Sequence, residues 1–79
     1  MPIKVFLAVV TKSGKEKEVQ KNLRSIDEVT LACTVSDGLY NVVAIIEVPT
    51  LDEYRTFSID KVSAVPNVLD YTSFIIMDE

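Results

Sequence analysis

The predicted strands of this 79-residue chain carry apolar side chains on both of their faces. Successive side chains of a strand point to opposite sides of the sheet, and in residues 3–10 both alternating sets are apolar. Residues 40–48 and 68–77 show the same pattern. An antiparallel sheet with one face in water should instead alternate apolar with polar residues. The sequence therefore predicts a sheet that is covered on both faces.

The predicted elements follow the order β, α, β, β, α, β. Four strands are expected at residues 3–10, 29–35, 40–48 and 68–77, and two helices at residues 14–26 and 51–64. Capping boxes, in which two side chains satisfy free backbone N–H groups at a helix start, are expected at Ser13 with Glu16 and at Thr50 with Glu53. Residues 1–79 then form one α+β domain of the ferredoxin-like βαββαβ class, a four-stranded antiparallel sheet with both helices on one face.

Two helices can cover only one face of such a sheet, so the second face needs another apolar partner. A small domain buries a limited share of its surface, and disulfides, metals or oligomerisation usually compensate. Cys33 is the only cysteine and the chain has no histidine, so an internal disulfide is excluded and the commonest metal ligand is missing. We expect a two-fold homodimer joined through the sheets, a dimeric α+β barrel.

The composition also limits the function. Without histidine the chain has no Ser/His/Asp or Cys/His catalytic pair, and Gly14 and Gly38 alone cannot build a phosphate loop, so no enzyme activity, metal or cofactor is expected. The net charge of −4 combines +4 in residues 1–26 with −8 in residues 27–79, which disfavours direct nucleic-acid binding. The apolar run of residues 5–10 is too short for a signal peptide, so a cytoplasmic location is expected, with no membrane partner.

One segment, residues 36–41, suggests a binding function. It reads Ser36-Asp37-Gly38-Leu39-Tyr40-Asn41 and is expected to make a tight hairpin turn between the second and third strands. Gly38 permits a positive φ and the close approach of a ligand to the backbone. Ordinary turn chemistry is the simpler explanation of an Asp-Gly pair, so the segment alone favours a plain turn and leaves the binding function as the alternative.

The whole chain resembles the RAM domain, the effector-binding domain of Lrp/AsnC transcriptional regulators. The resemblance rests on the order and spacing of several motifs, which are Val5-Phe6-Leu7-Ala8-Val9-Val10, Gly14-Lys15-Glu16-Lys17-Glu18-Val19, Leu23-Arg24-Ser25-Ile26, Glu28-Val29, Val35-Ser36-Asp37-Gly38-Leu39-Tyr40-Asn41, Leu51-Asp52-Glu53-Tyr54, Val65-Pro66-Asn67-Val68 and Tyr71-Thr72-Ser73-Phe74-Ile75-Ile76. The resemblance implies sheet-paired dimers that assemble into tetramers or octamers and bind small effectors, typically amino acids, between dimers.

The resemblance also implies site residues. The Gly-x-Tyr-Asp loop of the family maps onto residues 38–41, and its Thr-x-Thr pattern in the last strand maps onto Tyr71 and Ser73. Asn41 stands where the family usually has Asp, and Tyr71 where it has Thr, so the charge and the size of the pocket differ. The expected ligand-binding residues are Ser36, Asp37, Gly38, Leu39, Tyr40, Asn41, Tyr71 and Ser73.

Three functions are compatible with these observations. The first is a non-enzymatic module that binds an amino acid or related metabolite, oligomerises and serves transcriptional regulation without a DNA-binding domain of its own. The second is an assembly module that co-oligomerises with full-length Lrp/AsnC regulators without a ligand. The third is a small dimeric α+β-barrel enzyme, such as a cofactor-free monooxygenase or isomerase, against which the missing histidine argues.

Overall fold

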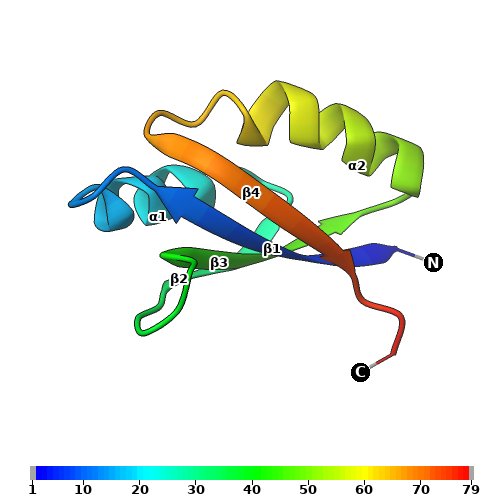
Figure 1. The fold of residues 1–79 in the computed structure, drawn as a ribbon. Coiled ribbons are helices and arrows are strands. Elements are labelled where there is room, and N and C mark those ends of the chain that lie inside the picture. The colour runs from blue at the N-terminus through cyan, green and yellow to red at the C-terminus, as the bar shows by residue number, and fades with distance from the viewer. Residues whose placement is uncertain (1, 79) are drawn as a thin grey trace.

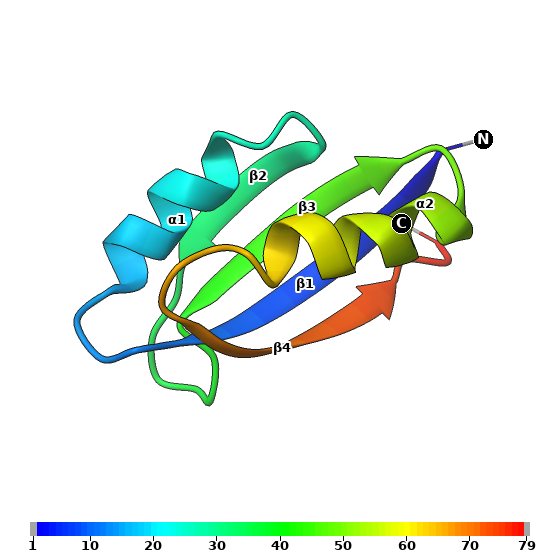
Figure 2. The same cartoon turned by 90° about the horizontal axis from the view of Figure 1, so that it is seen from above.

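The computed structural model describes residues 2–78 and has the predicted βαββαβ order (Figure 1). The elements are β1 (Ile3–Thr11), α1 (Glu16–Arg24), β2 (Val29–Thr34), β3 (Val42–Val48), α2 (Leu51–Phe57), a short π-helical segment η1 (Ser58–Val62) and β4 (Val68–Ile75). The strands form one antiparallel sheet in the order β2-β3-β1-β4. Both helices lie over the same face of this sheet, as Figures 1 and 2 show. The predicted ferredoxin-like fold class is confirmed.

The helix-covered face of the sheet holds the hydrophobic core. In β1 and β3 every second residue faces the helices, and these side chains are fully or almost fully buried: Val5, Leu7, Val9, Val42, Ala44, Ile46 and Val48. The helices add Val19, Leu23, Tyr54, Phe57 and Val62. The alternation of buried residues along each strand is what the period of two predicts.

The start of α1 differs from the prediction. Lys15, not Ser13, is the N-cap residue, and no side chain caps the helix there. The Glu16 carboxylate instead accepts a hydrogen bond from the Gly14 N–H at 3.1 Å. Gly14 has φ +82°, a conformation that turns the chain into the helix and that glycine adopts at little cost. The capping box expected at Ser13 is therefore wrong.

The connection between β2 and β3 is a seven-residue loop over residues 35–41, so the expected tight hairpin turn is also wrong. The positive φ of this loop, +66°, lies at Asp37 and not at Gly38. Aspartate tolerates the left-handed region better than most residues because its short polar side chain can bond locally. A Cβ atom added to Gly38 would meet nothing within 4 Å.

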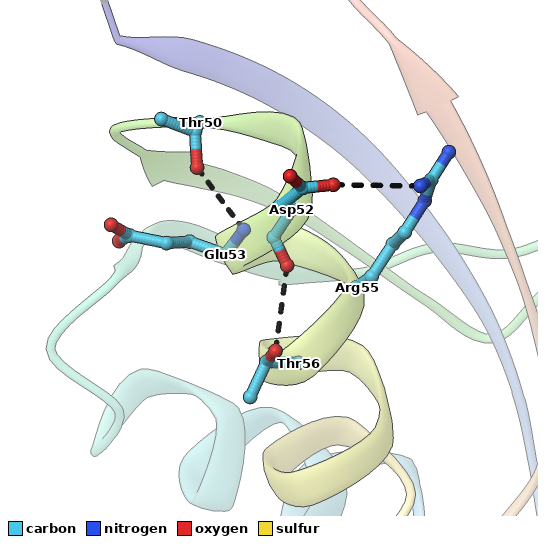
Figure 3. A network of polar contacts seen from close by, with 5 residues as sticks. All are labelled: Thr50, Asp52, Glu53, Arg55 and Thr56. Atoms are coloured by element: carbon cyan, nitrogen blue, oxygen red, sulfur yellow. Dashed lines mark hydrogen bonds and ion pairs between the residues drawn. The ribbon is translucent and has the colours of Figure 1, made fainter.

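The second helix begins as predicted and ends differently. The Glu53 N–H donates to Thr50 Oγ1 at 3.2 Å, which confirms Thr50 as the N-cap (Figure 3). The expected single helix over residues 51–64 is an α-helix only to Phe57, and the Ser63 N–H then bonds the Ser58 carbonyl, five residues back. That carbonyl also accepts from the hydroxyls of Ser63 and Tyr71. Such single π-helical turns occur where a side chain competes for the helical carbonyls.

Candidate functional site

The face of the sheet away from the helices is apolar and only partly buried. By register, Phe6 and Val10 of β1 share this open face with Val43 and Ile45 of β3, and all four side chains are half-buried. Its outer strands add Leu31, Cys33, Thr72 and Phe74. The rings of Phe6 and Phe74 lie 6.1 Å apart, and Leu31 and Phe74 are more than half exposed. No helix of residues 2–78 covers this face (Figures 1 and 2).

The loop of residues 35–41 lies at one end of the sheet and is tied to β1 through Asn41. The Asn41 N–H donates to the Val9 carbonyl, and the Asn41 side-chain oxygen accepts from the Thr11 N–H, both at 2.9 Å. The Val35 N–H closes the loop by donating to the Asn41 carbonyl. The side-chain oxygen of Asn41 is therefore hydrogen-bonded to the backbone of β1, while its NH₂ group has no partner among the described residues.

Tyr40 joins this loop to the far edge of the sheet. Its hydroxyl donates to Thr72 Oγ1 of β4 at 3.4 Å. Because β1 lies between β3 and β4, the Tyr40 side chain must cross β1 to make this contact. Thr72 pairs with Ala8, whose side chain is only 2% exposed although it belongs to the open face.

Tyr71 and Ser73, the other expected site residues, lie on the opposite side of the sheet from Thr72. They pair with Val9 and Leu7 of the core face and hydrogen-bond to the helix layer. The Tyr71 hydroxyl lies 2.6 Å from Ser58 Oγ and 3.2 Å from Ser63 Oγ. These contacts hold β4 against η1.

The Ser73 hydroxyl makes a further contact with the helix layer, a hydrogen bond with the hydroxyl of Tyr54 in α2. Burial raises the pKa of the Tyr54 hydroxyl above its usual value, against a smaller lowering by the bond to Ser73. The structure thus brings Tyr40 into contact with Thr72 and ties Asn41 to β1, and it places Tyr71 and Ser73 on the helix-covered face of the sheet. Sequence reasoning missed Thr72, although strand alternation puts it on the same face as Phe74.

The loop presents exposed polar groups at the end of the sheet. Residues 36–39 are exposed, and their backbone groups have no hydrogen-bond partner among the described residues. Together with Tyr40, Thr72 and the Asn41 amide they offer donors and acceptors suited to a small polar molecule. No three His, Cys, Asp or Glu side chains of residues 2–78 are grouped as a metal site would require. None of the described helices has the length and apolar character needed to cross a membrane.

Comparison with known proteins identifies the family. The sequence model of the Lrp/AsnC ligand binding domain matches residues 4–79. FFRP-DM1 is 29% identical, with a TM-score of 0.88 over 95% of this chain and 99% of that one. The hypothetical protein PHS023 from Pyrococcus horikoshii is 30% identical, with a TM-score of 0.86 over 98% of this chain and 92% of that one.

A more distant structure shares the fold alone. The transcriptional regulator NMB0573 from Neisseria meningitidis, solved as a complex with L-Met, is 15% identical and has a TM-score of 0.83 over 98% of this chain and 51% of that one. A search of curated proteins gives no match. The family match over nearly the whole sequence shows that the chain belongs to the Lrp/AsnC ligand-binding domain family, a regulatory family of effector-binding modules.

Proposed function

We propose that this protein is a non-enzymatic effector-binding module in which the loop of residues 35–41 holds a small metabolite carrying a carboxylate, an amino acid or a close relative. The observation that carries the proposal is the loop itself. The Val35 N–H closes it on the Asn41 carbonyl, and Asn41 and Tyr40 tie it to β1 and β4, while residues 36–39 are exposed and their backbone N–H groups are unpaired within residues 2–78. Exposed N–H groups held in one conformation are suited to a carboxylate.

The family and the fold support the same proposal. The Lrp/AsnC ligand-binding domain is a regulatory domain, and NMB0573, which shares the fold, was solved with L-Met. In this chain the Asn41 oxygen is occupied by the Thr11 N–H, so position 41 presents an amide NH₂ group and no carboxylate. We therefore expect the carboxylate of the ligand to contribute more to affinity than its ammonium group. Tyr71 and Ser73, as placed here, would act indirectly, by fixing β4 and thus Thr72.

The open face of the sheet supports a dimer as the working form. Phe6, Val43, Ile45 and Phe74 form a continuous apolar surface, and soluble monomers rarely leave such a surface uncovered. A second copy supplies a matching apolar face under two-fold symmetry. We propose a sheet-paired homodimer, able to assemble further into tetramers or octamers, that acts in the cytoplasm on transcription.

Native mass spectrometry and calorimetry with each of the twenty amino acids and the matching 2-oxo acids test the binding function. At least one compound should bind, and Gly38→Val should lower its affinity about tenfold or more by adding bulk to the loop. Because a Cβ at Gly38 meets nothing within 4 Å, this variant should fold normally. Gly38→Ala is the matched control and should retain most of the affinity.

If no compound binds, the proposed effector function is wrong. An oligomer that ignores every compound but forms mixed assemblies with full-length Lrp/AsnC regulators would instead support the co-assembly function. Turnover of an oxidisable aromatic compound that is lost in Tyr40→Phe would support an enzyme. The three functions therefore give different results with the same purified chain.

A further inference from the structure

The helix layer carries an acidic groove that plays no part in the proposed effector site. The groove has a volume of about 370 Å³ and is lined by Glu28, Asp52, Glu53, Thr56, Phe57, Asp60 and Lys61. Four carboxylates therefore face one ammonium group. The ammonium is already engaged, because Lys61 Nζ lies 2.9 Å from both carboxylate oxygens of Glu28 and 5.7 Å from the centre of the Phe57 ring.

Two of the groove carboxylates have no cationic partner among the described residues. Asp52 makes an ion pair with Arg55 at 3.5 Å, but Glu53 and Asp60 make none. Figure 3 shows the Glu53 carboxylate on the other side of the helix from Arg55. Glu53 and Asp60 are seven residues apart, about 10 Å along a helix.

Helix α1 carries the complementary charges. Lys17, Lys21 and Arg24 have the spacing i, i+4, i+7, which places them in one stripe on the helix. All three side chains are exposed and make no ion pair within residues 2–78, whereas Lys15 is paired with Glu18 at 3.6 Å. The basic stripe from Lys17 to Arg24 has the same length as the separation of Glu53 from Asp60.

Both features lie on the helix-covered side of the sheet, with α1 and α2 beside each other (Figure 2). Two copies that face each other through their helix layers, related by a two-fold axis along the helices, place each α1 opposite the partner's α2. The α1 stripe of each copy then meets the acidic groove of the other, so the same contact forms twice and leaves no unpaired copy of it. Ile59 of η1, which is 70% exposed, and Leu51 of α2, 41% exposed, add apolar surface to the helix layer.

We infer that the helix layer is a second self-association surface, in which the basic stripe of one copy docks into the acidic groove of another. This contact uses the side opposite the apolar open face, so it does not depend on the proposed effector function or on the sheet-paired dimer. Where sheet pairing also occurs, it joins dimers into larger assemblies. Exposed ion pairs are screened by salt, whereas apolar contacts are not.

Analytical ultracentrifugation of the whole chain at 20 mM and 500 mM NaCl tests the inference. The weight-average mass should rise about twofold at low salt, whatever its value at high salt. Lys17→Glu with Lys21→Glu should abolish that rise. Adding Glu53→Lys and Asp60→Lys to the same chain restores the net charge of −4 and should restore the rise, because the two charge patterns are exchanged.

A matched control separates this contact from a general effect of net charge. The control chain combines Lys17→Glu and Lys21→Glu with Asp27→Lys and Asp78→Lys. It also has a net charge of −4, but it leaves Glu53 and Asp60 acidic. This control should remain unassociated at low salt. The inference is overturned if the mass of the wild-type chain does not change with salt. It is also overturned if the control chain shows the same rise in mass at low salt as the chain with exchanged charges. A groove that binds an oligolysine peptide while the chain itself does not self-associate overturns it as well.

Discussion

The two faces of the sheet are built from similar residues and are used differently. Leu7 and its neighbours on the helix-covered face are fully buried within one chain. Phe6, one residue earlier on the same strand, is half-buried on the open face, and Phe74 beside it is 51% exposed. The same apolar character therefore stabilises the monomer on one side and remains available for a partner on the other.

The difference shows that apolar patterning predicts which residues require burial but not what buries them. On the covered face, the helices that complete the core belong to the same chain and their own apolar positions identify them. On the open face, the sequence predicts that something apolar must cover Ile45 and Phe74, and a second copy of the chain is expected there without any residue that identifies it. No helix of residues 2–78 lies on that side (Figure 1), and the proposed dimer would cover it.

The largest expected effect is on the covered face. Leu7→Ala removes a side chain that is 0% exposed at the centre of the sheet, and should lower the free energy of unfolding by about 3 kcal/mol. That is a large share of the stability of a domain of this size. Urea unfolding followed by circular dichroism measures it. A loss below about 1 kcal/mol would mean that the core tolerates a cavity, and that the two faces differ less than their burial suggests.

The next largest expected effect is the loss of the proposed dimer contact through the open face. Ile45→Lys places an ammonium group between Leu31 and Phe6, which flank Ile45 across the sheet. The proposed sheet-paired dimer should dissociate, so that the mass in 500 mM NaCl falls to the 8.8 kDa of one chain while the circular dichroism spectrum is retained. Ile59→Lys, on the helix layer, is the control and should leave this mass unchanged. A wild-type chain that is monomeric in high salt would contradict the proposed dimer directly.

Most of the fold could be predicted from the sequence, because strand alternation and the helix signals point to the same arrangement. Thr50 is the N-cap as expected, and the partition of β1 between two faces follows from a period of two. The π turn at Ser58 was not predicted, and the carbonyl at its start accepts a hydrogen bond from the hydroxyl of Tyr71, thirteen residues later. Local sequence does not encode that contact.

The candidate site was predicted less completely than the fold. The loop of residues 35–41 lies between the second and third strands, and Tyr40 and Asn41 tie it to β4 and β1. Its partner on β4 was not identified. Strand alternation places Thr72, between Tyr71 and Ser73, on the face of Phe74, but the hydrogen bond with Tyr40 depends on where the loop carries that ring. The positive φ of +66° at Asp37 could not be predicted either, because glycine adopts positive φ more readily and Gly38 is the next residue.

Removing a hydroxyl group on either side of β4 tests whether its contacts on the two faces of the sheet act separately. Tyr71→Phe removes the bonds to Ser58 and Ser63 in the helix layer, and should cost about 1 kcal/mol of unfolding free energy. Tyr40→Phe removes one longer bond to Thr72 at 3.4 Å and should cost less. Amide hydrogen exchange distinguishes them, because the first should loosen η1 and the second the loop. Equal exchange rates in both segments for both variants would contradict the separation of the two sides.

The smallest expected effect concerns the ion pair that joins the helix layer to the start of β2. The hydrogen bond from the Lys61 ammonium holds the pKa of the Glu28 carboxyl below its ordinary value of about 4.5. The folded state thus favours the charged carboxylate, so this contribution is complete above pH 4.5 and is lost as the pH falls through the lowered folded value. Glu28→Gln should remove this contribution at pH 7, at a cost of at most about 0.5 kcal/mol of unfolding free energy, because the pair is exposed.

Urea unfolding of the wild type and of Glu28→Gln measures this effect, and the difference between them should vanish in acid. The control Glu53→Gln, which deletes an unpaired carboxylate, should show no such difference at pH 7. A Glu28→Gln difference that persists at pH 2 would assign the effect to packing and not to charge.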